Sequence, residues 1–222
     1  MNHETATAYL AGTETAVKKR FEGIAEYTDL IKPPVFVTGS LPGTAEFEKR
    51  YAAWLEQNAD ALAKQKADAA KFKEQEFALS VLCGAVLHVA DKAIELYSTN
   101  THQPKEWTGL KPLHVRYCAG RMVRGIPLGL IVLAARNQHA HHGETLRAPS
   151  ITIFERLCTS SGYRDPAFDL NNPRLISFAA NVTALIKWRS FKNYDKDMRE
   201  LLRLPSQVDA AQVVSQFVGK TN

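Results

Sequence analysis

Residues 125–143 read GIPLGLIVLAARNQHAHHG, and this stretch decides how the rest of the chain is interpreted. Positions 126–135 are almost entirely apolar, which predicts a helix buried on every side rather than along one face. Pro127 suits the first turn of such a helix, and Gly143 suits the position just past its end. The sequence then becomes polar, with Arg136, Asn137, Gln138, His139, Ala140, His141 and His142 in succession. Polar side chains at the end of a buried helix conflict with its burial, and such conflicts concentrate at functional sites. This end of the helix is therefore the candidate active site.

The composition is that of an ordinary globular protein. Of the 222 residues, 45% are hydrophobic and 23% are charged, enough to bury a sizeable core. A formal net charge of +5 permits a polyanionic partner such as RNA without requiring one. The three cysteines are far apart, which favours a reducing compartment over a disulfide framework or a cysteine zinc site. The N-terminus lacks a secretion signal pattern, and the longest apolar run is shorter than a membrane span. We expect a cytoplasmic protein without a membrane anchor, a metal or another cofactor.

Helical periodicity over most of the chain predicts an all-α fold. Apolar residues recur at helical spacing over residues 4–31, and Pro33 and Pro34 end this predicted helix. Helical spacing resumes after Thr44, which is a suitable N-cap. This second helical region continues to about residue 98 without a proline. Its apolar residues are sparse up to about residue 73 and much denser from Phe77 onward. Further helices are expected at 150–158, from 175 to about 202 and at 208–218, and only VFV at 35–37 suggests an extended piece. We expect a helical bundle at 74–204, a long N-terminal helical extension at 1–73, and a short helix or tail at 205–222.

Two pairs of charged residues lie near the candidate site in sequence. Asp91 and Glu95 are one helical turn apart, so either of them is a candidate acid that supports the site. The alternative is a solvent-exposed polar face, the commoner place for charges. Arg121 and Arg124 are three residues apart just before the central helix, a spacing that suits contacts with RNA phosphates. Alternatively, both arginines cover the bundle surface or pair with acids.

Helix geometry constrains how the polar residues act together. On a continuous helix Asn137 and His141 share one face, whereas Arg136 and His141, five positions apart, point well away from each other. Either the helix ends between Arg136 and His141, or two copies of the chain meet and each site takes residues from both. The burial expected for the apolar run favours the second arrangement, a homodimer through this helix.

The run from Arg136 to His141 resembles the motif of the HEPN superfamily, the higher eukaryote and prokaryote nucleotide-binding domains. In that motif an arginine is followed by asparagine or another polar residue and, after three more residues, by histidine. The resemblance covers about residues 74–202 and also includes the apolar lead-in and the all-helical context. It implies a HEPN-like bundle and a metal-independent endoribonuclease, often the toxin or effector of a defence or stress system. Such proteins act as dimers and in some systems have a cognate inhibitor.

The resemblance also implies residue roles. His141 would take the proton of a ribose 2′-OH or give one to the leaving 5′-oxygen, because imidazole titrates near neutral pH. Arg136 would stabilise charge on the phosphate, and Asn137 would orient the His141 ring or contact RNA. His142 is a spare catalytic candidate, as is His139. The products would carry 2′,3′-cyclic phosphate and 5′-hydroxyl ends.

Three other interpretations remain open. Arg136 and the histidines are also explained as a purely structural helix end, since the helix dipole favours cations there. A metal site is a second possibility, but three histidines within four helical residues cannot converge on one ion, and no HExxH motif accompanies them. The third is a non-catalytic HEPN-like module that binds a nucleotide or a partner.

Overall fold

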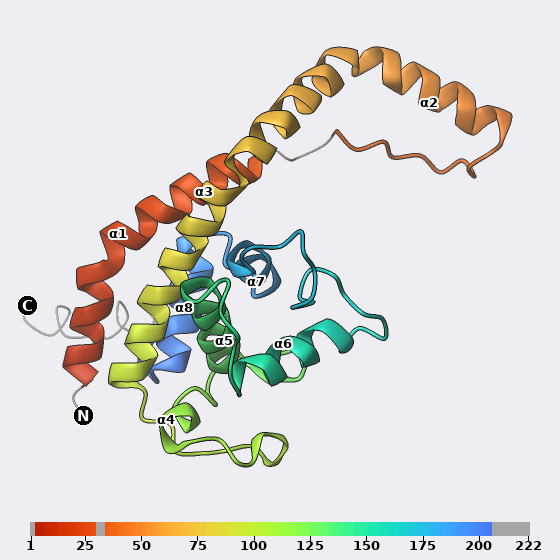
Figure 1. Ribbon diagram of the computed structural model, residues 1–222. Coiled ribbons are helices and arrows are strands. Elements are labelled where there is room, and N and C mark those ends of the chain that lie inside the picture. The colour runs from red at the N-terminus through yellow and green to blue at the C-terminus, as the bar shows by residue number, and fades with distance from the viewer. Residues whose placement is uncertain (1–2, 30–33, 206–222) are drawn as a thin grey trace, which may run out of the picture.

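The computed structural model describes residues 3–29 and 34–205, and over these residues the chain is a helical bundle (Figure 1). This confirms the all-α fold class. The elements, in chain order, are α1 (His3–Asp29), α2 (Ala45–Gln57), α3 (Ala59–Tyr97), a short 3-10 helix η1 (Lys105–Trp107), α4 (Pro112–Val115), β1 (Met122–Val123), β2 (Ile126–Pro127), α5 (Leu128–Ala140), α6 (Ser150–Thr159), α7 (Ala179–Leu185) and α8 (Phe191–Leu201).

Helix α5 lies at the centre of the bundle, as its apolar sequence predicts. It packs against α3 on one side and against α6 and α7 on the other, and all its residues at 128–135 are buried. One chain therefore covers the apolar run by itself. A dimer through α5 would have to use the end of the helix and the loop that follows, because no apolar face of the run is left uncovered.

A short β-hairpin with a two-residue turn lies directly before α5. Strands β1 and β2 pair antiparallel, and the turn between them consists of Arg124 and Gly125, with φ angles of 50° and 74°. Two consecutive positive φ angles are typical of the type I′ turn, whose twist matches a tight hairpin. Pro127 belongs to β2 and immediately precedes the helix, so it lies one position before the helical turn predicted for it.

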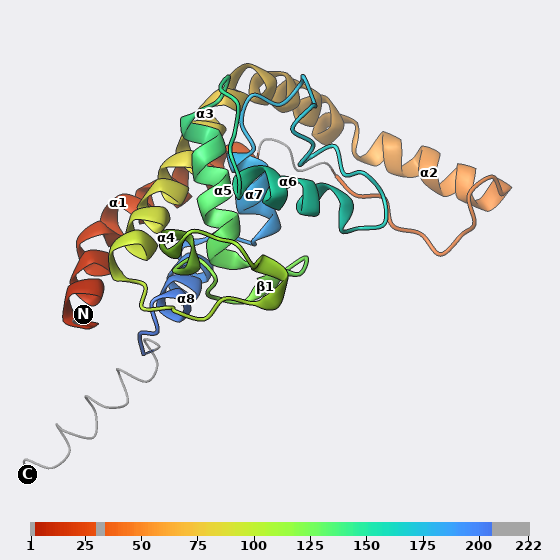
Figure 2. The same ribbon diagram turned by 60° about the horizontal axis from the view of Figure 1, so that its bottom comes forward.

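Helix α1 belongs to the bundle core and is not part of a separate extension. It lies alongside α3 in both views (Figures 1 and 2), and its residues Val17, Phe21 and Ile24 are at most 4% exposed in the common core. The structure thus differs from the predicted boundary at residue 74, which falls inside α3 and separates α1 from the core. Helical spacing identifies a buried face but does not reveal which distant helix covers it.

The part of the extension that does project is α2 with the first half of α3 (Figures 1 and 2). None of the residues at 45–73 is buried, in agreement with their sparse apolar pattern. Thr44 is the N-cap of α2, and its hydroxyl accepts a hydrogen bond from the Phe47 amide at 3.2 Å, as expected. Phe36 packs edge-on against Phe47 and Tyr51, so the preceding loop is held to α2 by aromatic contacts.

The helix predicted from 175 to about 202 is interrupted. Helix α7 ends at Leu185, and Lys187 has a φ of 61°, the left-handed conformation that closes a helix. The Trp188 amide donates to the Thr183 carbonyl at 2.8 Å, which completes the helix end, and the chain then begins α8 in a new direction. The break buries Trp188, so packing of one aromatic side chain decides against a continuous helix. The helix predicted at 208–218 lies outside the described residues.

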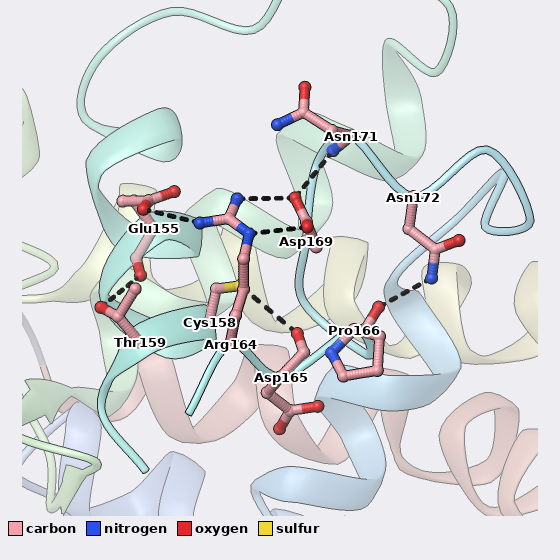
Figure 3. Close-up of polar contacts among 9 residues, drawn as sticks. All are labelled: Glu155, Cys158, Thr159, Arg164, Asp165, Pro166, Asp169, Asn171 and Asn172. Atoms are coloured by element: carbon pink, nitrogen blue, oxygen red, sulfur yellow. Dashed lines mark hydrogen bonds and ion pairs between the residues drawn. The ribbon is translucent and has the colours of Figure 1, made fainter. Parts of the chain in front are cut away.

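The long connection between α6 and α7 is organised by Arg164 (Figure 3). Its guanidinium donates twice to Asp169, at 2.8 Å each, and once to Glu155 of α6 at 3.1 Å. This pairing lowers the pKa of Asp169 to about 2. The Asn172 side chain donates to the Pro166 carbonyl at 2.9 Å and closes the next turn. The chain then reaches the segment at 176–178, which exchanges hydrogen bonds with Gln138 at the end of α5.

The most apolar part of α3, Glu76–Tyr97, has the length and composition of a membrane span. The same part of α3 supplies buried residues to the packing of α3 against α1, α5 and α7. A helix at the centre of a folded bundle shows the same apolar composition.

Candidate functional site

The polar motif lies where α5 ends. The last helical residue is Ala140, and His141 is the C-cap, with φ −122° and ψ 35°. The helix therefore ends between Arg136 and His141, the first of the two arrangements that the spacing allowed. Arg136 projects from the helix toward α3, whereas His141 belongs to the loop that leads to α6.

A buried network holds Arg136 against α3. The Arg136 Nε lies 3.2 Å from Oδ2 of Asp91, an ion pair in which the N–H is not aligned for a hydrogen bond. The other carboxylate oxygen, Oδ1, accepts a hydrogen bond of 2.9 Å from the Tyr117 hydroxyl. The Asp91 side chain is 3% exposed and that of Arg136 is 24% exposed. The network thus links α3, α5 and the segment that follows α4.

The charge of Asp91 depends on competing effects. Burial raises the pKa of the Asp91 carboxyl, while the Arg136 charge and the Tyr117 hydrogen bond lower it by less. Burial and the neighbouring carboxylate also raise the pKa of Tyr117, so the phenol remains a hydrogen-bond donor. The buried carboxylate is thus held by one ion pair, with Arg136, and by one hydrogen bond, from the Tyr117 hydroxyl.

Asn137 connects this network to a cavity. Its Oδ1 accepts a hydrogen bond from Arg136 Nη1 at 3.0 Å, and its Nδ2 donates to Ser150 Oγ at 3.2 Å. Asn137, Ser150 and His141 line a solvent-open cavity of about 610 Å³, whose other walls come mainly from the loop between α5 and α6. Arg136 is not part of that wall in a single chain, and Asn137 lies between Arg136 and the open space.

His141 is the exposed catalytic candidate in this cavity. Its Nδ1 lies 3.2 Å from Oε2 of Glu144, a contact that becomes an ion pair when the ring is protonated. The His141 side chain is 51% exposed, so the ring remains accessible to a substrate. An accessible imidazole with a carboxylate on one nitrogen has the arrangement that proton transfer requires.

The other polar residues of the motif hold the segment at 176–178. Gln138 donates to the Ile176 carbonyl and accepts from the Phe178 amide, at 3.0 and 2.9 Å. His139 Nδ1 lies 2.9 Å from Ser177 Oγ, and burial, with a smaller effect of His142, lowers the His139 pKa. These contacts give Gln138 and His139 structural roles.

His142, the spare candidate, lies outside the cavity wall. It is exposed, and its Nδ1 lies 3.3 Å from the His139 carbonyl. The three motif histidines therefore have different surroundings. Within residues 3–29 and 34–205, no group of three His, Cys, Asp or Glu side chains is placed to hold a metal ion.

The two acid candidates on α3 differ in position. Asp91 contacts Arg136, whereas Glu95 pairs with Lys92 on the surface of α3. Glu95 does not line the cavity with His141. The structure therefore brings Asp91, and not Glu95, to the motif.

Arg121 and Arg124 both have internal partners. Arg121 Nε and Nη2 pair with the two oxygens of the buried Asp197 carboxylate, at 3.0 and 2.8 Å. Arg124 Nη1 donates to Asp165 at 3.0 Å and to the Leu157 carbonyl at 2.7 Å. These contacts correspond to the second interpretation of the two arginines, pairing with acids, and leave RNA binding by them a prediction.

Two further residues lie near the motif, and no sequence pattern singles them out. Tyr117 shares Asp91 with Arg136, and His114 lines the same cavity as His141. Both come from residues 112–118, far from the motif in sequence. No spacing rule connects them with α5, although an isolated histidine close to the basic segment was a visible signal.

Comparison of this chain with known protein families, with curated proteins and with solved structures finds no match. The resemblance of residues 136–141 to the HEPN motif stays a prediction from the sequence.

Proposed function

We propose that this protein is a metal-independent endoribonuclease of the HEPN type. The observation that carries the proposal is the placement of Asn137 and His141 on one open cavity, with Arg136 bonded directly behind Asn137. The cleavage would produce a 2′,3′-cyclic phosphate and a 5′-hydroxyl, which requires one proton acceptor, one proton donor and stabilisation of charge on the phosphate.

The proposed roles follow from the surroundings of each side chain. His141 transfers a proton, because its ring is accessible and has Glu144 on Nδ1. Asn137 donates to or orients the phosphate from the cavity wall. Arg136 supplies positive charge: its Nε and Nη1 are engaged, and within the described chain Nη2 has no hydrogen bond or ion pair. A second protomer placed at the exposed end of α5 would complete the site in the manner that the family resemblance implies.

The test is incubation of the full-length protein with mixed RNA in EDTA, followed by analysis of the product ends. The variant His141→Ala is compared with His102→Ala, which removes an exposed histidine away from the cavity. We expect cyclic phosphate ends from the wild type and from His102→Ala, and a loss of about 10²–10⁴-fold in His141→Ala. Equal cleavage by His141→Ala and the wild type contradicts the mechanism, and cleavage that EDTA abolishes indicates a metal site instead.

One observation favours a second candidate, a module that binds RNA or a partner without cleaving it. Arg136 is already paired with Asp91 in a buried network, which is also the arrangement of a purely structural arginine. RNA binding that persists in His141→Ala, without cleavage by any protein in the set, would select this alternative.

A further inference from the structure

His114 has an imidazole with no role in holding the fold. It lies in α4, its side chain is half-buried, and within the described chain its ring nitrogens make no hydrogen bond or ion pair. Its backbone amide and carbonyl do make hydrogen bonds, to Lys111 and from Tyr117, so the position of the residue is well defined. A fixed, half-buried imidazole without a partner of its own is available to a ligand.

Two adjoining cavities meet at His114. The first is the cavity of about 610 Å³ that contains Asn137 and His141, and the second, of about 250 Å³, is lined mainly by η1 and the residues up to Lys111. Both cavities share His114, Ala148 and Pro149 as wall residues. A ligand that occupies both cavities therefore passes His114. The larger volume is in the range of small-ligand sites, and an RNA strand has repeating units that can occupy neighbouring cavities.

The charged groups on these walls fit a phosphodiester between two nucleosides. Lys111 lines the smaller cavity and Arg147 the larger one, and Arg147 is exposed, with no side-chain partner within the described residues. Two acids also line the walls. Glu144 is in contact with His141, and Glu106 lines the smaller cavity. Each of the two cavities that share His114 thus has one cation in its wall, which favours binding of a phosphate near their shared wall.

We propose that His114 is the second proton-transfer residue of the ribonuclease site and acts on the same phosphodiester as His141. This inference rests on the proposed function. His114 removes the proton from the ribose 2′-OH, whose oxygen forms a new bond to phosphorus. The bond from phosphorus to the 5′-oxygen breaks, and protonated His141 gives its proton to that oxygen. One proton is taken and one is given, so the products are the cyclic phosphate and the 5′-hydroxyl, and solvent then restores the two rings.

The surroundings of the two rings determine which is the base. Burial, with a smaller effect of the Lys111 charge, lowers the pKa of His114, so this ring is neutral and accepts a proton at neutral pH. His141 has Glu144 beside Nδ1, and that contact becomes an ion pair when the ring carries the proton that it must give. The chain thus contains both proton-transfer groups in one cavity, which the Arg136–His141 motif alone does not provide.

The experiment uses the full chain and a short oligodeoxynucleotide that contains a single ribonucleotide, so that only one position has the 2′-OH needed for cleavage. The wild type, His114→Gln, His141→Gln and the control His102→Gln are compared, each checked for native circular dichroism and melting temperature. In a second substrate, sulfur replaces the bridging 5′-oxygen, because a thiolate leaves without being protonated. On the oxygen substrate we expect both cavity variants to lose about 10²–10⁴-fold in rate, and the control to lose nothing. Sulfur restores most of the rate to His141→Gln and none to His114→Gln.

The remaining outcomes overturn the proposal in distinguishable ways. If His114→Gln cleaves the oxygen substrate at the wild-type rate while His141→Gln does not, the proposed function survives and the role of His114 is refuted. If sulfur rescues His114→Gln, this residue is not the base, and the assignment fails. If the folded wild type cleaves neither substrate, the proposed function itself is refuted, and the role of His114 with it.

Discussion

Replacing Asp91 with alanine tests whether a buried carboxylate holds the candidate site together. In Asp91→Ala the Tyr117 hydroxyl loses its carboxylate acceptor at 2.9 Å and keeps only the longer contact, 3.4 Å, to the backbone carbonyl of residue 91. Arg136 loses its counter-ion. A buried donor without an adequate acceptor costs about 1–3 kcal/mol of stability. Removal of one partner from a buried ion pair costs about 3–5 kcal/mol, and this range already includes part of the cost of the unsatisfied donor. Because 24% of the Arg136 side chain is exposed, water relieves part of the penalty. We expect the free energy of unfolding to fall by about 3 kcal/mol.

The assay is urea unfolding followed by circular dichroism. With a urea dependence of about 1–3 kcal/mol per molar, the transition midpoint should fall by roughly 1–3 M. The matched control is Glu95→Ala, which removes a carboxylate one turn along the same helix but on its surface, and it should cost about 0–1 kcal/mol. Asp91→Asn should cost less than Asp91→Ala, because the amide oxygen still accepts from Tyr117. A loss below about 1 kcal/mol in Asp91→Ala, equal to that of Glu95→Ala, would refute the idea that this network fixes α5 against α3.

Other predictions concern the packing of α5 and the groups around it. A Cβ on Gly129 would lie 2.5 Å from the Tyr117 carbonyl oxygen, so Gly129→Ala should lower the free energy of unfolding by about 1–3 kcal/mol. The control is Gly12→Ala on α1, where the Cβ meets open space and the free energy of unfolding should rise by about 1 kcal/mol. Thermal unfolding measures both changes. Burial lowers the His139 pKa below its usual 6.5, so the unfolded chain takes up the proton first, and stability should fall as pH decreases below about 6.5. Unfolding from pH 7.5 to 5 should show this slope in the wild type and a weaker one in His139→Gln. Arg121→Ala should lower the free energy of unfolding by about 3 kcal/mol, because its buried carboxylate partner loses its charge pair, and urea unfolding measures the loss.

Much of the fold could be predicted from residue patterns. Apolar residues without a polar face predict that α5 is buried, and the sparse pattern at 45–73 predicts that this part is solvated. The helices at 3–29 and 150–159 follow from the same local rule. The interruption at Lys187 could not be predicted, because residues on both sides continue the helical spacing, and burial of Trp188 decides where the chain turns.

The candidate site was predictable only in part. The motif from Arg136 to His141 is contiguous in sequence, so its location at one helix end follows from the pattern alone. The partners of those residues come from elsewhere. Asp91 was one of two equivalent candidates on α3, and helical spacing cannot choose between it and Glu95, because the choice depends on which face of α3 meets α5.

Residue patterns alone predict that the protein is helical, that α5 is buried and that the end of this helix is polar. These properties depend on neighbours within a few turns, and local periodicity records them. Other features became visible only in the folded chain: α1 completes the core, Asp91 and Tyr117 hold Arg136, and His114 shares a cavity with His141. Such contacts join residues that are far apart in the chain. They depend on the packing of complementary surfaces, which no local spacing encodes.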